Sequence, residues 1–357
     1  MKIVAALSGG VDSAVAAALM QRAGHEVIGV TLQLADLSSR GPGVSRCCSA
    51  SDVESAREVA RTLGIPHYLL DFEATFRTEV LEPFVASYLA GETPLPCARC
   101  NSRLKFGELL GVADQFGAEM LVSGHYARVE RDDAGQSLLR RGSDRDKDQS
   151  YFLFELDREQ LARVAFPLGA LRKAEVRLAA AELGLPNANR TDSQEVCFVP
   201  EGASYVDVLA NLAPERLPGA GEIVDAGGAV LGHHAGFHRY TVGQRRGIGV
   251  SAPSRLYVVG VDAAANRVTV GSAAETMRSR LWLRDVNWLV DAPPARTPAL
   301  VQIRSRHEAV EAEIVAGDRG TAEVRFDAPV SAPTPGQAAV FYDGDRLLGG
   351  GWIVRTA

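Results

Sequence analysis

The string Ser8-Gly9-Gly10-Val11-Asp12-Ser13 has the residue types of an anion-binding loop. It lies between a short apolar run, residues 3–7, and an alanine-rich segment with the composition of a helix. Adjacent glycines let backbone N–H groups approach an anion closely, and a helix N-terminus behind them adds about half a positive charge. The hydroxyls of Ser8 and Ser13 can donate to phosphate oxygens. The string therefore predicts a phosphate-binding loop.

Asp12 is unusual beside an anion unless a cation lies between the two, and Mg²⁺ is the natural bridge. The chain has neither the G-x-x-x-x-G-K-[ST] nor the G-x-G-x-x-G pattern, so no P-loop lysine is predicted. A plain glycine turn that begins a helix remains the alternative, and it fits the complete string less well. The string resembles the pyrophosphate loop of the PP-loop ATPases, which split ATP into AMP and pyrophosphate to adenylate a substrate.

Five cysteines are the second chemical signal: Cys47, Cys48, Cys97, Cys100 and Cys197. Three interpretations are open: a zinc site, which lacks a second properly spaced pair; a thioredoxin-like pair, whose flanks differ; and sulfur chemistry between cysteines distant in sequence. Positive charge at Arg99, Arg103 and Lys105 favours a thiolate at Cys100 and so the third interpretation. We interpret Cys47 and Cys48 as structural.

The elements that must position these residues alternate between strand and helix in the first 200 residues. We expect strands at 3–7, 26–34, 66–71 and 119–123, and helices at 11–23 and 51–63, the latter capped by Ser51. This alternation predicts a doubly wound α/β domain with a parallel sheet over residues 1–200. Short valine-rich runs then predict a central β-rich linker domain at 201–275 and a β-barrel at 276–357. The expected later strands are 221–224, 256–261, 267–270, 281–286, 299–304, 322–326 and 336–342.

Composition narrows the class of protein. The chain has 357 residues, of which 46% are hydrophobic and 23% charged. These values fit two or three globular domains and argue against a disordered, collagen-like or membrane-spanning chain. Five cysteines in so long a chain do not match a disulfide scaffold, and residues 3–7 are too short for a signal peptide. We therefore expect a cytoplasmic protein with reduced thiols and no membrane partner.

The formal charge of −6 means that any nucleic-acid surface must be local. No acidic residue stands between Asp225 and Asp262. The same stretch carries basic side chains at Arg239, Arg245, Arg246, Arg255, His233, His234 and His238. Arginine suits phosphate because its planar fork binds two oxygens, so the stretch predicts an RNA-binding patch. A solvated arginine-rich loop is the alternative.

Eight motifs in order make the chain resemble a known family. They are SGGVDS at 8–13, CCS at 47–49, LGIPHY at 63–68, GETPLPCARCN at 91–101, SGHYAR at 123–128, KDQSYFL at 147–153, DSQEVCF at 192–198 and YTVGQRRGIG at 240–249. Together they resemble the tRNA-specific 2-thiouridylases over essentially the full length. The fold that this implies is a PP-loop domain of the adenine nucleotide alpha hydrolase-like type, followed by the β-rich domain and the barrel.

The resemblance also implies a reaction. The family replaces the 2-oxygen of the wobble uridine with sulfur in tRNAs for Lys, Glu and Gln, using ATP and Mg²⁺ to adenylate that oxygen. By position, Cys100 resembles the nucleophile and Cys197 the persulfide carrier, which form a disulfide as sulfur is delivered. A cysteine desulfurase or sulfur-relay protein is the implied sulfur donor, and tRNA the implied partner.

Further residues are implied one at a time. The nucleotide contacts would be Ala6, Leu7, Ser8, Gly9, Gly10, Val11, Asp12, Ser13, Leu32 and Gly124. A flipped target base would lie at Leu95, Pro96 and Cys97, since stacking hides the C2 oxygen. The tRNA contacts would be His125, Lys147, Asp148, Gln149, Arg304, Ser305 and Gln337. No side chain is assigned as a resident metal ligand. Some members carry a catalytic aspartate where Cys97 stands, so a thiol here would need to ionise or another group to act.

Two other functions are compatible with parts of the pattern. A PP-loop amidotransferase or amide-forming ligase would share SGGVDS but would not need Cys100 or Cys197. A non-enzymatic RNA-binding protein with a decayed loop would bind tRNA without turning over ATP, although intact Asp12 and Ser13 argue against decay.

Overall fold

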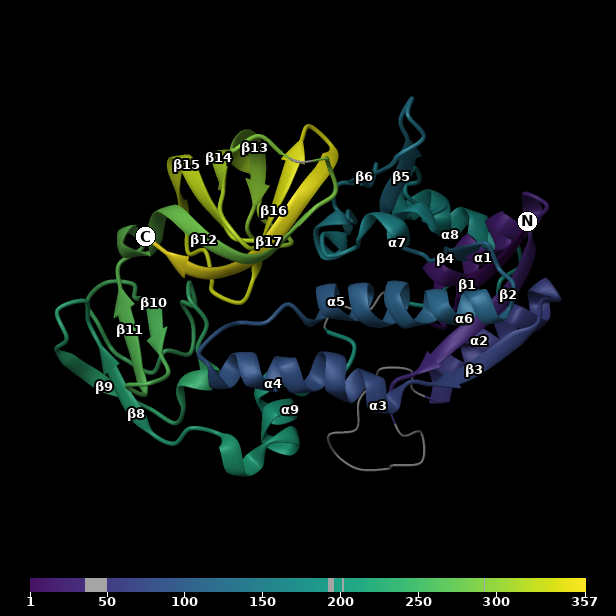
Figure 1. Ribbon diagram of the computed structural model, residues 1–357. Helices are drawn as coiled ribbons and strands as arrows, with labels where there is room; N and C mark the ends of the chain where they lie inside the picture. Colours follow the sequence, from purple (N-terminus) through teal and green to yellow (C-terminus); the bar gives the residue numbers. More distant parts are fainter. Residues whose placement is uncertain (36–49, 192–195, 201, 292) are drawn as a thin grey trace. The chain divides into compact units, whose positions relative to one another are not determined.

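The computed structural model describes residues 1–35, 50–191, 196–200, 202–291 and 293–357, and Figure 1 shows its elements. Cys47, Cys48 and the middle of the DSQEVCF motif lie outside the described residues. Contacts divide the chain into two units. The first comprises Met1–Val80, Pro96–Ala203 and Asp345–Leu347, and the second comprises Leu81–Leu95, Ser204–Gly344 and Leu348–Ala357.

The first unit is built on a five-stranded parallel sheet in the order β3-β2-β1-β4-β7. The strands are β1 (Lys2–Ala6), β2 (Glu26–Gln33), β3 (His67–Asp71), β4 (Met120–Val122) and β7 (Val164–Ala165). Ile3, Val4 and Ala5 of the central strand are fully buried, as expected of a parallel strand covered on both faces. The chain leaves β1 toward β2 and β3 and later returns to the other side of β1 as β4, which places the topological switch point between β1 and β4.

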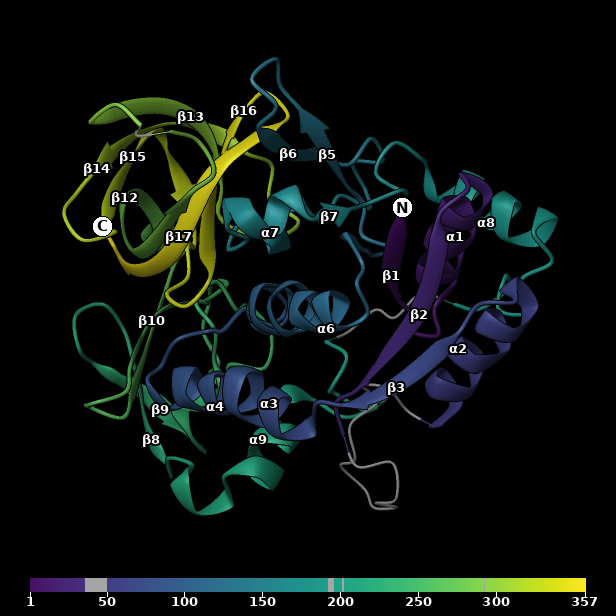
Figure 2. The ribbon, with the colours of Figure 1, turned by 45° about the vertical axis from the view of Figure 1, so that its right-hand side comes forward.

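The α-helices of this unit are α1 (Val11–Arg22), α2 (Ala50–Leu63), α3 (Glu73–Phe76), α5 (Pro96–Arg99), α6 (Leu109–Gln115), α7 (Arg158–Ala162) and α8 (Lys173–Glu182). Two stretches are π-helical, Arg77–Leu81 and Cys100–Glu108, and Ser150–Leu153 is a 3₁₀ turn. A hairpin is formed by β5 (Ala127–Arg131) and β6 (Ser137–Arg141). Helices α1, α2 and α8 lie on one side of the sheet and α6 on the other (Figure 2).

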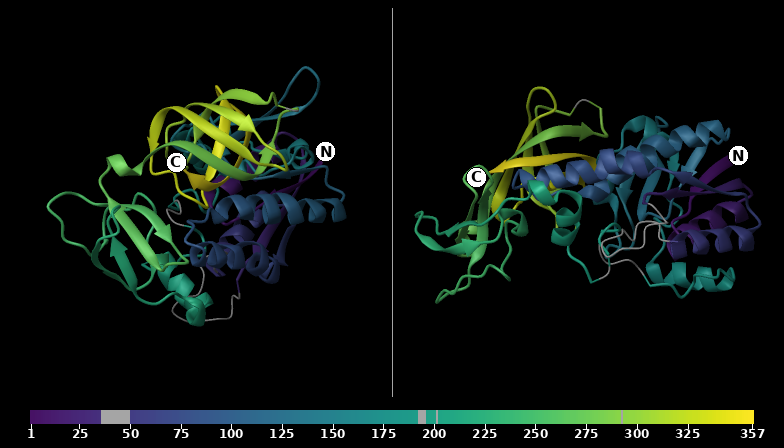
Figure 3. Two further views of the ribbon diagram at one scale, coloured as in Figure 1. Left: turned by 60° about the vertical axis from the view of Figure 1, so that its left-hand side comes forward. Right: turned by 90° about the horizontal axis from the view of Figure 1, so that it is seen from below.

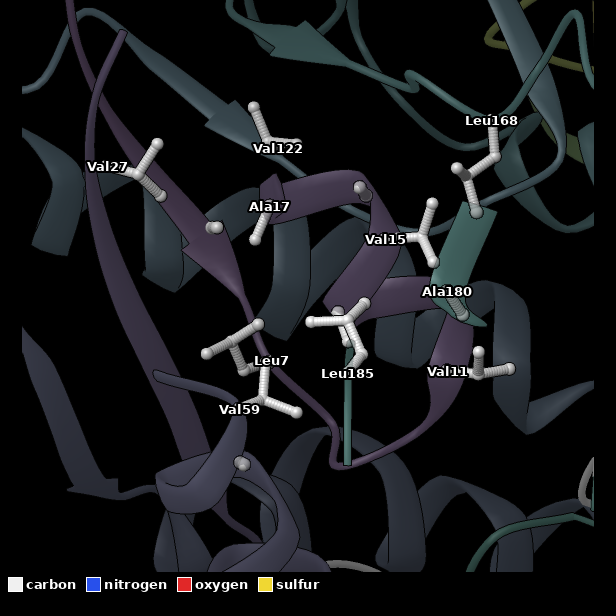
Figure 4. Packing of buried hydrophobic residues seen from close by; sticks show 14 of the residues in the cluster. Leu7, Val11, Val15, Ala17, Val27, Val59, Val122, Leu168, Ala180 and Leu185 are labelled. Atoms are coloured by element: carbon white, nitrogen blue, oxygen red, sulfur yellow. The ribbon is translucent and has the colours of Figure 1, made fainter. Parts of the chain in front are cut away.

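The core of the first unit explains why α1 is rich in alanine. Its buried residues include a run from Ala14 to Ala18, whose small side chains let the helix lie close to the sheet. Val15 packs in one cluster with Leu7, Val59 and Leu185, as Figure 4 shows. This cluster joins the loop after β1 to α2 and to the chain that follows α8, so the loop rests on a rigid base.

The second unit has a helical and a β part. It contains α4 (Glu82–Leu89), α9 (Tyr205–Leu212) and two 3₁₀ turns, Pro214–Arg216 and Phe237–Arg239, with a third at Ala274–Thr276. A four-stranded sheet in the order β10-β11-β8-β9 consists of β8 (Gly221–Val224), β9 (Val230–His234), β10 (Tyr257–Asp262) and β11 (Arg267–Gly271). Tyr88 of α4 stacks on Tyr205 of α9 with ring centroids 4.7 Å apart.

The barrel of the second unit closes on itself (Figure 3). Its strands are β12 (Met277–Trp288), β13 (Arg296–Gln302), β14 (Val310–Ala316), β15 (Ala322–Ser331), β16 (Ala338–Asp343) and β17 (Arg346–Thr356). They run in the order β12-β15-β14-β13-β16-β17, and the pairing of β12 with β17 completes the ring. Side chains from 322 to 326 alternate between buried and partly exposed, which is the pattern of a barrel wall.

The predicted fold class is confirmed: an α/β domain with a parallel sheet, then a β-rich part and a barrel. Some details differ from the expectation. Ser51 does not cap its helix, because α2 already includes Ala50. A helix, α9, follows residue 200, and strands β9, β14 and β17 were not predicted. No helix in the described ranges is long and apolar enough to cross a membrane.

Candidate active site

The loop after β1 has the geometry of an anion site. Gly9 takes a left-handed conformation with φ of +77°, which glycine adopts without strain. Gly10 is the N-cap of α1, so the first N–H groups of the helix receive no side-chain cap from it. The Ser8 and Ser13 hydroxyls lie 3.2 Å apart, and Ser13 Oγ accepts a bond of 3.1 Å from the Ser8 N–H. Ser13 Oγ also donates to the Gly10 carbonyl at 2.9 Å, so the two hydroxyls lie together beside the N-terminus of α1, and a helix N-terminus favours a bound anion.

The cation beside Asp12 is a residue that the sequence analysis missed. Lys173 Nζ, at the first turn of α8, lies 2.7 and 2.8 Å from the two carboxylate oxygens of Asp12. The Tyr126 hydroxyl donates to Asp12 Oδ1 at 2.8 Å, and Lys173 Nζ lies 5.8 Å from the centroid of the Tyr126 ring. Asp144 accepts from the Lys173 backbone N–H and fixes the start of α8. The loop therefore has a lysine after all, supplied 161 positions downstream by another helix.

Gly124 meets the loop from the neighbouring strand. It follows β4, next to β1 in the sheet, and a Cβ at this position would lie 2.6 Å from the Asp12 carbonyl carbon and 2.7 Å from the Ser13 nitrogen. The backbone at 124 thus packs directly on the first turn of α1. Leu32, the predicted adenine contact near the end of β2, is buried with 8% of its surface exposed. Both residues lie at the carboxyl ends of strands, where ligands bind in such sheets.

Replacing Gly124 with alanine is expected to displace the loop. The added methyl group would collide with backbone atoms that cannot rotate away, which typically costs about 1–3 kcal/mol of unfolding free energy. We expect a lower urea midpoint together with weaker ATP binding, measured by denaturation and by titration. Gly111→Ala in α6 is the matched control, because nothing lies within 4 Å of the new methyl group and alanine favours a helix. Equal urea midpoints for the two variants would contradict this prediction.

The predicted cysteines lie on two segments of the first unit. Cys97 belongs to α5 and is partly buried, whereas Cys100 is buried and begins the π-helical stretch Cys100–Glu108. Cys197 is exposed, in a turn anchored by Phe198, whose ring packs edge-on against Phe76 at 6.0 Å. Cys97 and Cys197 are close enough for each to affect the ionisation of the other. The structure thus brings together thiols that are 100 positions apart in the sequence.

The positive neighbours of these thiols have other partners. Arg99 pairs with Glu155 at 4.0 Å, and Ser102 Oγ donates to the same carboxylate at 2.9 Å. Lys105 Nζ donates to Asn101 Oδ1 at 3.1 Å, and its charge acts on Cys97 and His125. The basic cluster predicted to activate Cys100 is therefore partly neutralised by Glu155.

Cys97 is expected to stay protonated at neutral pH. Burial raises the pKa of its thiol to about 11, the neighbouring Cys197 adds to this rise, and Lys105 opposes it. At pH 8 about one Cys97 in a thousand would then be a thiolate. We expect iodoacetamide labelling of the Cys97 peptide to increase about tenfold per pH unit and to level off near pH 11. Urea-unfolded protein should level off near the ordinary pKa of 9.0. The same plateau in folded and unfolded protein would contradict the prediction.

His125 is held in its neutral form. Its Nδ1 lies 2.8 Å from Ser123 Oγ, and its ring packs against Phe106 and Phe166 at 5.5 and 5.7 Å, while these two rings also contact each other at 5.6 Å. Burial, with a contribution from the charge of Lys105, lowers the pKa of His125 well below its ordinary value. A contact of His125 with tRNA would then be a neutral hydrogen bond rather than an ion pair.

The predicted tRNA contacts at 147–149 form an ordered loop. Asp148 accepts hydrogen bonds from Gly142, Ser150 and Arg141 at 2.9–3.1 Å, and Gln149 Oε1 accepts from the backbone N–H at 126. These side chains shape the loop internally. Lys147, whose backbone N–H donates to the Asp144 carbonyl, is partly buried. A tRNA contact through these three residues stays a prediction.

Gln337 has a clear structural function in the second unit. Its Nε2 donates to the backbone carbonyls of Thr93 and Pro94 at 3.0 and 3.1 Å, so it holds the segment that leads to Leu95. Leu95 itself is buried with 9% of its surface exposed. Gln337, predicted as a tRNA contact, therefore acts on the chain beside the proposed target-base residues.

Arg304 lines a cavity of about 620 Å³ within the second unit. The other polar side chains in its wall are Arg239, Thr241 and Gln244, together with Tyr205 and Tyr240. Arg304 Nη2 donates to the Ser331 carbonyl at 2.6 Å, and Ser305 is exposed. Two arginines from segments far apart in sequence thus share one concave surface.

The predicted basic stretch divides into two groups. Its four arginines are exposed: Arg239, Arg245, Arg246 and Arg255. Its histidines do not all contribute, because His234 and His238 are buried at 4% and 3% exposure. Burial lowers the pKa of both, so they are neutral at pH 7. The cationic surface of this stretch is therefore made by its exposed arginines.

Within the described residues, no group of three or more His, Cys, Asp and Glu side chains has the arrangement of a metal site. Asp12 is the carboxylate of the phosphate loop. One carboxylate with nucleotide phosphates is a donor set that suits Mg²⁺, which usually keeps several waters. Both Asp12 oxygens pair with Lys173, so an ion that enters with its nucleotide would share this carboxylate with the lysine.

The comparisons with known proteins divide the chain into three consecutive parts. Residues 1–201 match a family model described as a tRNA methyl transferase HUP domain. Residues 207–272 match a tRNA methyl transferase PRC-barrel domain, and residues 278–353 an aminomethyltransferase beta-barrel domain.

Curated relatives match over nearly the whole chain. The tRNA-specific 2-thiouridylase MnmA of Geobacter metallireducens is 50% identical, covering 99% of this chain and 96% of that protein. The proteins of the same name in Acidobacterium capsulatum and Acidithiobacillus ferrooxidans are 49% and 48% identical, each over 99% of this chain and 98% and 99% of their own length.

Solved structures are more distant. An NMN synthetase from Francisella tularensis matches 61% of this chain and 78% of its own, at 21% identity and a TM-score of 0.35. A 4-thiouridine synthetase in an RNA complex with bound ATP matches 60% of this chain and 51% of its own, at 18% identity and a TM-score of 0.35. On the family model and the near-full-length relatives, this chain belongs to the tRNA-specific 2-thiouridylase family.

Proposed function

We propose that this chain catalyses ATP-dependent 2-thiolation of the wobble uridine of tRNA, of the Lys, Glu and Gln type. The observation that carries the proposal is the presence, in one unit, of an anion loop with its own lysine and of two approaching thiol segments. The relatives named tRNA-specific 2-thiouridylase support the same reaction. Neither an amide-forming ligase nor a passive RNA-binding protein would need both features.

The first half-reaction uses the phosphate loop. The loop N–H groups and the Ser8 and Ser13 hydroxyls bind the ATP phosphates, while Leu32 and Gly124 lie where the nucleoside would rest. The C2 oxygen of the uridine attacks the α-phosphorus, and pyrophosphate leaves. Mg²⁺, when bound with ATP, neutralises phosphate charge. The positive charge of Lys173 offsets the negative charge of Asp12 beside the phosphates, and the Tyr126 hydroxyl orients the Asp12 carboxylate.

The second half-reaction uses the cysteines. Cys197 is exposed, which suits a residue that must receive sulfur from another protein as a persulfide. The outer sulfur attacks C2 and AMP leaves with the oxygen. The Cys100 thiolate then attacks the Cys197 sulfur, so that the C2 sulfur departs as the thiocarbonyl and a Cys100–Cys197 disulfide forms. An external thiol reduces the disulfide before the next cycle.

The proposal also includes the sulfur donor, the cellular compartment and the domains that bind tRNA. A cysteine desulfurase or a sulfur-relay protein supplies the persulfide sulfur, and the cytoplasm keeps the thiols reduced. The domains are proposed at 1–200, 201–275 and 276–357, with the last two binding tRNA. The exposed arginines of the basic stretch and Arg304 supply positive charge for the phosphate backbone.

The experiment that tests the function is pyrophosphate release from Mg-ATP with a wobble-uridine tRNA transcript and its wobble-cytidine variant. Release with the uridine transcript alone is expected. Cytosine also has a C2 oxygen, but it lacks the N3–H and the C4 oxygen by which a uracil site reads its flipped base. Equal release with both transcripts, or without tRNA, would contradict the wobble-uridine assignment and favour a ligase. Salt-sensitive tRNA binding with no release would favour a non-enzymatic RNA-binding protein.

A further inference from the structure

The carbonyl oxygen of Gly9 is the acceptor of three side-chain donors from outside the phosphate loop. Ser55 Oγ in α2 lies at 2.9 Å, Asn187 Nδ2 at 2.9 Å and Arg190 Nη1 at 3.2 Å. Asn187 and Arg190 belong to the segment that follows α8. A carbonyl oxygen has two lone pairs, so three donors saturate it.

This saturation determines the direction of the next N–H group. In a trans peptide the C=O and the following N–H point in opposite directions. Because the Gly9 oxygen is held toward α2 and the segment after α8, the Gly10 N–H is turned the other way. It points to Ser8 Oγ, at 3.4 Å, on the side of the loop where both serine hydroxyls lie. An anion would be bound on that side.

The burial of Asn187 is explained by its hydrogen bond to the Gly9 carbonyl and not by packing alone. Asn187 is 6% exposed, and its other polar atom, Oδ1, is buried without a hydrogen-bond partner among the described residues. An unsatisfied buried carbonyl oxygen costs free energy that an apolar side chain would not. Rotating the amide by 180° would place Oδ1 against the Gly9 oxygen and create repulsion, so the N–H orientation is chemically required. Arg190 is held in turn by an ion pair with Asp52.

We propose that Asn187 and Arg190 are positioning residues of the nucleotide site, which hold the Gly9–Gly10 peptide so that the Gly10 N–H faces the phosphates. Ser55 assists from α2. None of the three touches the nucleotide in this proposal, and they act through the Gly9 carbonyl. The inference rests on the proposed function because it assumes that ATP is the anion bound by the loop.

The test compares Asn187→Asp with Asn189→Asp. The two changes are chemically identical, but Asn189 is exposed and two positions farther along the chain. At 187 the new carboxylate oxygen would face the Gly9 oxygen, so a donor is lost and a repulsion is added. We expect the Kd for ATP to increase about 10- to 100-fold for N187D and to stay within about twofold for N189D. The same increase should appear in the KM for ATP, with kcat at saturating ATP nearly unchanged.

Ser55→Ala provides a second, milder variant that should fold, since alanine is favourable within a helix. It removes one donor of three, and we expect an increase of about three- to fivefold in the Kd for ATP. ATP-independent tRNA affinity and Tm are measured for every variant. N187D and S55A binding ATP as tightly as wild type would overturn the proposal. So would a loss of ATP affinity matched by an equal loss of tRNA affinity, which would mean a general structural role. Wild-type protein that binds no ATP would overturn the proposed function together with this inference.

Discussion

Cys197→Ser is expected to abolish sulfur transfer while leaving pyrophosphate release intact. Serine has no sulfur to carry as a persulfide, so the fall in 2-thiouridine formation should be on the order of 10³-fold or more. The phosphate loop belongs to other elements of the unit and does not depend on this thiol. The measurement is a mercury-gel assay of tRNA thiolation beside a pyrophosphate assay on the same samples. Retained pyrophosphate release shows that the variant is folded.

Cys100→Ser is expected to give the same loss by a different route. Cys197 is exposed, so a sulfur donor should still load it with a persulfide. Cys100 is buried, so it is placed to react with a neighbouring cysteine rather than with another protein. Alkylation and mass spectrometry should therefore find the persulfide on Cys197 in the Cys100→Ser variant and none at that position in Cys197→Ser. Continued thiolation by either variant would contradict the assigned roles.

Cys97 is an alternative to Cys100 as the thiol that attacks the persulfide, and serine variants of the two residues distinguish them. It lies near Cys197, so it is placed to attack the persulfide in place of Cys100. Its pKa of about 11 leaves little thiolate at neutral pH, which argues against attack by Cys97. If Cys97 were the attacking residue, Cys100→Ser would retain activity and Cys97→Ser would lose it. The thiol at 97 also cannot serve as an ionised substitute for an aspartate at this pKa.

The sequence was sufficient for the parts of the fold that depend on local pattern. Gly24 and Gly64 marked the ends of two helices, and short apolar runs marked the strands, which located β1, α1, β2, α2 and β3 within one or two residues. Strand β17 was missed because Gly349, Gly350 and Gly351 interrupt its pattern. A side chain at Gly349 or Gly351 would collide with β12. Glycine is therefore needed there because of a neighbouring strand, and that contact is visible only in the tertiary structure.

The candidate site also has some residues that could be predicted from the sequence and others that could not. The loop string was recognisable because all its residues are consecutive. Lys173, Asn187 and Arg190 were not, because each acts on the loop across more than 160 positions of chain. The available signal was the charge of Asp12, which required a cation. Mg²⁺ was inferred, and the cation that the structure supplies is a lysine at the start of α8.

Lys173→Met is expected to impair ATP use more than any other change outside the loop and the cysteines. Methionine keeps much of the apolar stem but removes the charge, leaving the Asp12 carboxylate unneutralised next to the incoming phosphates. We expect kcat/KM for ATP to fall about 10²- to 10³-fold, equivalent to about 3–4 kcal/mol of transition-state stabilisation. Tyr126→Phe removes one neutral donor to the same carboxylate and should cost about fivefold.

The double variant Asp12→Asn/Lys173→Met distinguishes charge balance from loss of a phosphate contact. If the lysine mainly neutralises Asp12, removing the carboxylate as well removes the repulsion, and the double variant should be more active than Lys173→Met alone. If the lysine mainly binds the nucleotide, the two losses should add. The side chain of Lys173 is 12% exposed and that of Asp12 is 32% exposed, so the pair is weakly screened and the coupling should exceed about 1 kcal/mol. Additivity within about 0.5 kcal/mol would show that the ion pair seen in the structure does not control the charge of the loop.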